Sequence, residues 1–315
     1  MITLRYFLRA FVVTAIFVLA GNGTYLHAQQ DFKGERERPP NPEVRRRSRP
    51  ATPRPSGRRR PRSEQPVSTV RNTVPSLPAN NQVEAAIERG NTALDARRFA
   101  EAEAQYRRAS TLDPNEARAY YGLGNVHFDQ ERYADAAREY QQAIRWAPGF
   151  TDAYFGLGQA YSGLRRYAEA IEAYKQAIRL EPDHTLAHLN LGVAYFEQRR
   201  DAEAIEQLKQ SIHLKPDFAL AHYNLGVVYL DQKRHAEAIQ ALQQAIRFQP
   251  NYAQAYNNLG VAYGEQQRYA ESIEAFKQAI RLKPDYANPY FGLGLMYYEQ
   301  QRDAEAIQNL RQAIR

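Results

Sequence analysis

Proline recurs at a fixed interval of 34 residues through the C-terminal part of the chain. The six prolines share one position in the interval and are Pro114, Pro148, Pro182, Pro216, Pro250 and Pro284. A constant period of roughly 20 to 50 residues is typical of arrays built from one supersecondary unit. We therefore expect residues 83–315 to be a repeat array, and we number positions 1–34 within each unit. The seven predicted units are 83–116, 117–150, 151–184, 185–218, 219–252, 253–286 and 287–315.

Each unit contains two amphipathic patterns. Positions 4, 7, 8 and 11, with Leu-Gly at 7 and 8, fall on one face of a helix. A second pattern has small residues at 20 and 27 and a large one at 24. Gly at position 8 and Ala at position 20 predict two closely packed helices, with larger side chains interdigitating around them. Proline at position 32 ends the second helix, and the Asp or Asn that usually follows it is expected to cap the next helix.

These positions together resemble the tetratricopeptide repeat family, whose pattern combines Leu-Gly, Tyr, Ala, a large residue and Pro. The resemblance covers roughly three quarters of the chain. The first unit departs most, with Arg89 in place of Leu, although it keeps Gly90, Tyr106 and Pro114. Divergence at one end is typical of a capping repeat. The resemblance implies an all-α, right-handed superhelical solenoid whose first helices line a concave face that binds polypeptides.

The same resemblance implies that positions 2, 5, 6, 9, 12 and 13 form the exposed stripe of that concave face. Asn recurs at position 6 in three successive units, and an Asn ladder can bind the backbone of an extended peptide. Aromatic and aliphatic residues at positions 5 and 9 would supply the affinity. The competing explanation is that the Asn residues at position 6 and the apolar residues at positions 5 and 9 only pack within the array. The candidate groove residues are Tyr121, Phe155, Leu189, Asn190, Val193, Tyr223, Asn224, Val227, Asn257, Asn258, Val261, Phe291 and Leu295.

A clamp for a C-terminal carboxylate needs Lys or Arg at positions such as 2, 5 and 6. Arg118 is the one basic residue at those positions in the seven units, so such a clamp is not expected.

The net charge of +7 is unevenly distributed. Residues 1–80 hold 15 Lys and Arg against 5 Asp and Glu, so the rest of the chain is slightly acidic. Ten of the 17 prolines also lie before residue 79, and apolar residues are scarce there. This composition predicts a disordered linker over 29–82. It is either a solvated spacer or an arm that binds anionic membrane or cell-wall polymer, with nucleic acid the least favoured target.

The first 28 residues have the layout of a secretory signal. Arg5 and Arg9 precede a short apolar run from Ala10 to Ala20, and a polar stretch ends at Ala28. We expect cleavage after Ala28 and an exported protein, periplasmic or secreted. The alternative is an uncleaved segment that anchors the chain in the inner membrane. The chain contains no cysteine, which excludes a lipoprotein anchor, disulfides and thiolate chemistry.

The sequence offers little support for catalysis or metal binding. His184 and His188 have the spacing of two metal ligands on one helix, but no third ligand recurs nearby. His188 and His222 are interpreted as substitutes for the Tyr found at position 4 elsewhere. The acidic residue at position 13 and the Arg at position 16 predict a pair that stabilises the turn between the helices. We expect no enzyme activity and no cofactor.

The last unit is truncated. Ile307, Leu310 and Ile314 should be less covered than their counterparts, which indicates either self-association through this unit or a frayed end. The function predicted from the sequence is a non-enzymatic scaffold in the cell envelope. Its concave groove would hold an extended or helical peptide of a partner protein. The alternative is an anchor or spacer that acts through its Arg-rich tail.

Overall fold

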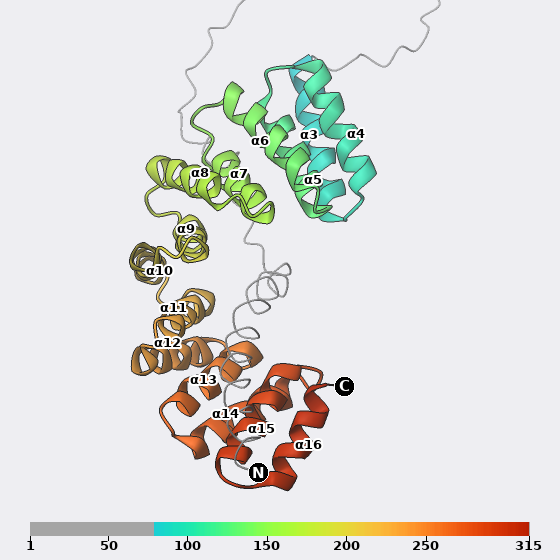
Figure 1. Ribbon diagram of the computed structural model, residues 1–315. Coiled ribbons are helices and arrows are strands. Elements are labelled where there is room, and N and C mark those ends of the chain that lie inside the picture. The colour runs from blue at the N-terminus through green and yellow to red at the C-terminus, as the bar shows by residue number, and fades with distance from the viewer. Residues whose placement is uncertain (1–78, 315) are drawn as a thin grey trace, which may run out of the picture.

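The computed structural model describes residues 79–314, which form an arch of paired helices (Figure 1). The predicted signal over 1–28 and most of the predicted linker lie outside this range. The first helices of the units are α3 (Ala79–Asp95), α5 (Ala117–Asp129), α7 (Thr151–Gly163), α9 (Thr185–Glu197), α11 (Ala219–Asp231), α13 (Ala253–Glu265) and α15 (Ala287–Glu299). The second helices are α4 (Phe99–Leu112), α6 (Tyr133–Trp146), α8 (Tyr167–Leu180), α10 (Asp201–Leu214), α12 (His235–Phe248), α14 (Tyr269–Leu282) and α16 (Asp303–Ala313).

These seven pairs confirm the predicted all-α array of helix pairs. One boundary differs, because α3 begins at Ala79, within the range 29–82 that the composition predicts to be linker. Val83, Ala86 and Ile87 are buried in a cluster with residues of α4 and α5, so the first unit packs against the second.

Within each unit, the glycine at position 8 lies against the large residue at position 24. A Cβ added at Gly124 would lie 2.5 Å from the Tyr140 ring, and one at Gly226 would lie 2.7 Å from Leu242 Cγ. Real Cβ atoms do not approach so closely, so these positions require glycine for close helix packing. A Cβ added at Gly192 would also lie 3.1 Å from the carbonyl oxygen of Ala204, at position 20, so the predicted close approach of the two helices at positions 8 and 20 is confirmed.

The turn between the two helices has a left-handed residue at position 15 in every unit, with φ between 55° and 62°. The N–H at position 16 donates to the C=O at position 11, as in Arg132 to His127 at 2.9 Å. The N–H at position 15 donates to the C=O at position 12, as in Glu131 to Phe128 at 2.9 Å. This pair of bonds is the Schellman motif, in which the left-handed residue is usually glycine. Here the residues are Arg97, Glu131, Arg165, Arg199, Lys233, Gln267 and Gln301.

The predicted pairing of the arginine at position 16 with the acid at position 13 is wrong. This arginine instead binds the acid at position 19, as in Arg166 with Glu169 at 2.7 Å. The left-handed residue turns the chain so that the arginine is the N-cap of the second helix, whose first turn contains position 19. The same contact occurs in the pairs Arg98–Glu101, Arg132–Asp135, Arg166–Glu169, Arg200–Glu203, Arg234–Glu237, Arg268–Glu271 and Arg302–Glu305.

In units three to seven the same guanidinium also covers the ring of the tyrosine at position 11, at 4.4–4.7 Å from its centroid. Exposed ion pairs contribute little alone, and stacking on an aromatic ring adds a second contact to the same guanidinium. Two acids at position 13 contact the preceding unit: Asp231 pairs with Arg199 at 3.0 Å, and Glu197 is hydrogen-bonded to Tyr167.

The predicted capping of first helices by the Asp or Asn after proline is also wrong. The N-cap is the next residue, position 34, and its side chain accepts a backbone N–H in only two of the first helices that follow such a cap. These are Glu116, which accepts from Arg118, and His184, which accepts from Ala187. At the other junctions position 34 is Phe or Tyr, and several of these rings pack against the preceding first helix.

Candidate binding groove

The first helices line the inner face of the arch. Neighbouring first helices contact one another along the array, from α3 and α5 through α13 and α15. In the middle of the arch, the second helices α8 and α10 lie outside α7 and α9 (Figure 1). The bidentate contact of Arg118 with Glu84 at 2.8 Å joins position 2 of two successive units. Side chains at position 2 therefore lie next to one another along this face.

Aromatic residues at position 5 pack against other rings of their own unit. Tyr121 lies 5.7 Å from the Tyr140 ring of its own unit and 4.9 Å from the Phe150 ring that precedes the next helix. Phe155 has the same arrangement with Tyr174 and His184. Tyr121, Phe155 and the equivalent Phe291 remain half-buried, so part of each ring is accessible.

Other predicted groove residues are buried rather than exposed. Leu189 is 3% exposed, Tyr223 is 1% exposed and Asn257 is 5% exposed. The Tyr223 ring packs at a tilt against Tyr252, the position-34 residue of its own unit, with ring centroids 4.8 Å apart. The expectation of an exposed stripe is wrong at these positions, because position 34 and the neighbouring unit also contact position 5.

The three Asn residues at position 6 are 5–9% exposed, and two of them, Asn190 and Asn258, contact the preceding unit. Asn258 Nδ2 donates to the Tyr223 hydroxyl at 3.3 Å, and Asn257 Nδ2 donates to Asn258 Oδ1 at 3.1 Å. Asn190 hydrogen-bonds the Tyr174 hydroxyl of the preceding unit. The prediction of an exposed Asn ladder along the groove is therefore wrong.

Position 6 is complementary in size to position 24 of the preceding unit. Gly122, Gly156 and Gly292 lie against aromatic rings, and a Cβ added at any of them would be 2.3–2.7 Å from the ring. Where position 24 is the smaller Leu208 or Leu242, position 6 of the next unit is Asn224 or Asn258. Asn at position 6 thus occupies room that an aromatic residue fills at other junctions. Tyr174 with Asn190 is the exception, and there the hydroxyl and amide bind one another.

The residue type at position 9 also depends on the residue at position 24 of the same unit. The hydroxyls of Tyr106 and Tyr140 each donate to an Asn at position 9, Asn91 and Asn125, at 2.7 Å. Where position 24 has no hydroxyl, position 9 is apolar: Val193, Val227, Val261 or Leu295. Val193 and Leu295 are buried, and Val227 and Val261 are half-buried.

On the concave face, the half-buried apolar residues at positions 2 and 9 lie in the middle of the array. Position 2 is charged in the first three units, with Glu84, Arg118 and Asp152, and becomes Leu186 and Leu220 in the fourth and fifth. Both Leu residues are half-buried against the core. Positions 2 and 9 share one helical face, so Leu186, Leu220, Val227 and Val261 form what we call the apolar strip. The residue-level prediction from sequence missed Leu186 and Leu220, although their position belongs to the predicted stripe.

The charged residues before the strip are held within the array. Hydrogen bonds from Arg118 to Glu116 and Glu84 raise the pKa of its guanidinium, so the charge is already neutralised by neighbours. Burial, with a smaller contribution from Glu181, raises the pKa of Asp152 to about 6. The one basic residue at positions 2, 5 and 6 thus has two carboxylate partners, consistent with the argument against a carboxylate clamp.

The histidines have structural partners. His222 Nε2 lies 2.9 Å from the Pro216 carbonyl, the contact that the Tyr120 hydroxyl makes with Pro114. His188 contacts the Pro182 carbonyl and Gln207. Their interpretation as substitutes for Tyr is confirmed. In residues 79–314 no group of three His, Asp or Glu side chains is placed to hold a metal ion, and no helix is long and apolar enough to cross a membrane.

Solved structures with the same fold include MamA, 27% identical, with a TM-score of 0.50 over 55% of this chain and 94% of that one. A tetratricopeptide repeat protein from Parabacteroides merdae is 16% identical, with a TM-score of 0.60 over 74% of this chain and 92% of that one. The pilF protein of Pseudomonas aeruginosa is 19% identical, with a TM-score of 0.60 over 71% of this chain and 99% of that one. Comparison with curated proteins gave no match.

A family match covers nearly the whole of the described array, over residues 78–315. Its range begins one residue before α3, which agrees with the start of the first helix at Ala79. The chain therefore belongs to the family described as the cilia and flagella-associated protein 70 C-terminal domain, a tetratricopeptide repeat scaffold for protein–protein interaction.

Proposed function

We propose that the concave face around α9, α11 and α13 binds an extended, largely apolar segment of a partner protein. The observation that supports this most is the apolar strip, which follows three charged residues at position 2 of the first units. Covering half-buried apolar side chains with a ligand would stabilise the complex by about 25 cal/mol for each Å² of apolar surface removed from water. The strip rather than the buried Asn residues would supply the affinity.

A matched substitution set tests this proposal. The variant replaces four residues of the strip with Gln: Leu186, Leu220, Val227 and Val261. The fold should tolerate Gln there, because Gln254 occurs at position 2 and Gln159 at position 9 of other units. Peptides selected from a display library against the intact chain serve as ligands, and calorimetry measures their affinity. We expect the quadruple variant to bind at least about tenfold more weakly, since a few central apolar contacts carry most binding energy.

The control makes the same kind of change on the second helices. Position 30 is apolar and exposed in successive units, and its control set is Leu180, Leu214, Phe248 and Leu282, each replaced with Gln. This variant should keep the wild-type affinity. Equal losses in the two variants, or full binding by the first, would contradict a concave site. Thermal unfolding of both variants verifies that the array is intact.

We also propose, from the sequence, that the chain is exported and processed after Ala28. Support comes from the basic start and the short apolar run, which lie outside the described residues. Mass spectrometry of the N-terminal peptide of protein purified from its native cells should show a chain that begins at Gln29, as Gln or cyclised to pyroglutamate. Recovery of the intact Met1 terminus in the cytosol would overturn export. Two further expectations stay predictions. One is that the tail binds an anionic surface. The other is self-association through the last unit, where Ile307 and Ile314 are exposed.

A further inference from the structure

The second unit departs from the others at several positions that face one cleft. In units three to seven, position 11 is a Tyr ring covered by the arginine at position 16. Its hydroxyl can also accept a hydrogen bond from position 25 of the preceding unit, as Tyr161 does from Gln141 at 2.7 Å. In the second unit position 11 is His127, which lacks the outer part of a Tyr side chain.

The smaller ring leaves a polar atom without a partner. His127 is 3% exposed, and its Nδ1 has no hydrogen bond. The position-25 residue there is Arg107, which turns toward Glu103 at 2.7 Å instead of donating to the ring. A cavity of about 320 Å³ lies at this point, lined by His127, Arg107, Arg132, Asp135, Arg138 and Glu139, among others.

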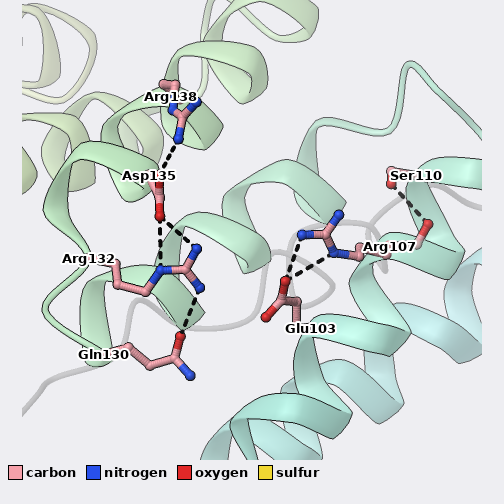
Figure 2. Close-up of polar contacts among 7 residues, drawn as sticks. All are labelled: Glu103, Arg107, Ser110, Gln130, Arg132, Asp135 and Arg138. Atoms are coloured by element: carbon pink, nitrogen blue, oxygen red, sulfur yellow. Dashed lines mark hydrogen bonds and ion pairs between the residues drawn. The ribbon is translucent and has the colours of Figure 1, made fainter.

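Two more departures enrich this cleft in guanidinium groups. Position 22 is Arg138, where other units have Glu, Gln or Ala, and position 19 is Asp135, where the other six have the longer Glu. The single Asp135 carboxylate binds both Arg132 and Arg138. Figure 2 shows this shared carboxylate, with the Arg107–Glu103 pair of α4 on the opposite side of the space.

The N–H donors of these three arginines outnumber the carboxylate oxygens that accept hydrogen bonds from them. Each guanidinium has five N–H groups, and Asp135 and Glu103 can engage only a part of those from three arginines. The side chains of Arg107, Arg132 and Arg138 are 64%, 48% and 76% exposed, so they can turn toward a ligand. Glu139 also lines the cleft, and burial raises the pKa of its carboxyl group.

We propose that this cleft is a binding site for a phosphate group. Arg107 approaches from α4, whereas Arg132 and Arg138 approach from the start of α6, and a tetrahedral oxyanion presents oxygens in several directions at once. Guanidinium groups bind phosphate oxygens through paired, charge-assisted hydrogen bonds. His127 Nδ1 supplies a further polar contact at the buried end of the cavity. The site lies between α4 and α6, away from the apolar strip, and is separate from the proposed peptide groove.

The test uses the intact chain, with inorganic phosphate and O-phosphoserine as probes at constant ionic strength. The His127 imidazole resonance, assigned by its loss in His127→Tyr, should shift saturably with either probe. Arg138→Glu introduces the residue found at position 22 of three other units and should weaken binding at least about tenfold. His127→Tyr should fill the cavity, stack under Arg132, abolish binding and leave thermal stability equal to or above wild type.

The control is Arg179→Glu, which makes the same charge change on the exposed surface of α8. It should bind both probes as wild type does. A shift with O-phosphoserine alone would identify a phosphorylated side chain as the source of the group, and a shift with both would include free phosphate. Absence of a saturable shift with either probe, or equal weakening by Arg138→Glu and Arg179→Glu, would overturn the proposal.

Discussion

Replacing Gly156 with Asn should lower the free energy of unfolding by about 2–3 kcal/mol. A Cβ at this position would already lie 2.7 Å from Tyr140 Cζ, so the Asn side chain has no room beside the ring. Urea titrations, fitted with a nearest-neighbour treatment suited to repeat arrays, measure the change. Gly149→Asn is the matched control, because a Cβ there meets nothing within 4 Å, and it should be nearly neutral.

The same junction provides a rescue. At the junction between the fourth and fifth units the three complementary residues are Val193, Leu208 and Asn224. The triple variant Asn125→Val, Tyr140→Leu, Gly156→Asn copies this set and removes the Asn125 side chain that would lose its hydroxyl partner. Its stability should return to within about 1 kcal/mol of wild type. A triple variant no more stable than Gly156→Asn alone would show that positions 6, 9 and 24 are not a packing unit.

The second large effect comes from the left-handed residues at position 15. Replacing both Gln267 and Gln301 with Gly should raise the free energy of unfolding by about 1–2 kcal/mol in total. A left-handed conformation costs an L-residue roughly 1–2 kcal/mol, and the greater flexibility of unfolded Gly offsets part of the gain. Both residues have φ near 60°, and neither carries a charge. Denaturant titration of the full chain measures the gain.

The control for this prediction is Ala at the same two positions, which removes the Gln side chains but keeps the Cβ. That variant should show no comparable gain, and an equal gain with Ala would rule out backbone strain as the cause. Arg199→Gly should gain less than the Gln replacements, because it also removes the contact with Asp231 at 3.0 Å. The exposed position of that Arg keeps the loss small.

The sequence predicts the repeated unit well, because the period and the close packing of the two helices at positions 8 and 20 are local to one unit. It predicts the polar contacts of the turn poorly. Position 16 has an acid three residues before it and another three residues after it, and spacing alone does not distinguish them. The left-handed residue at position 15 decides between the two, and a run of Arg, Glu, Lys and Gln there gives no glycine signal for it.

The groove was predicted incompletely for a related reason. Periodicity along one helix shows which residues share a face, but it does not show what the next unit covers. Leu189 and Tyr223 lie on the expected face and are nevertheless buried. The covariation of position 6 with position 24 of the preceding unit was present in the sequence, and it identifies Asn224 and Asn258 as packing residues. Comparison across junctions, rather than within a unit, would have found it.

The concave site is tested most directly by photocrosslinking a selected peptide to the intact chain. A photoreactive phenylalanine derivative is placed at Leu220 in one variant and at the exposed Gln240 of α12 in another. We expect the peptide to crosslink from position 220 and unlabelled peptide to compete for this product, whereas position 240 should give none. Crosslinking from position 240 with none from position 220 would contradict binding in the groove.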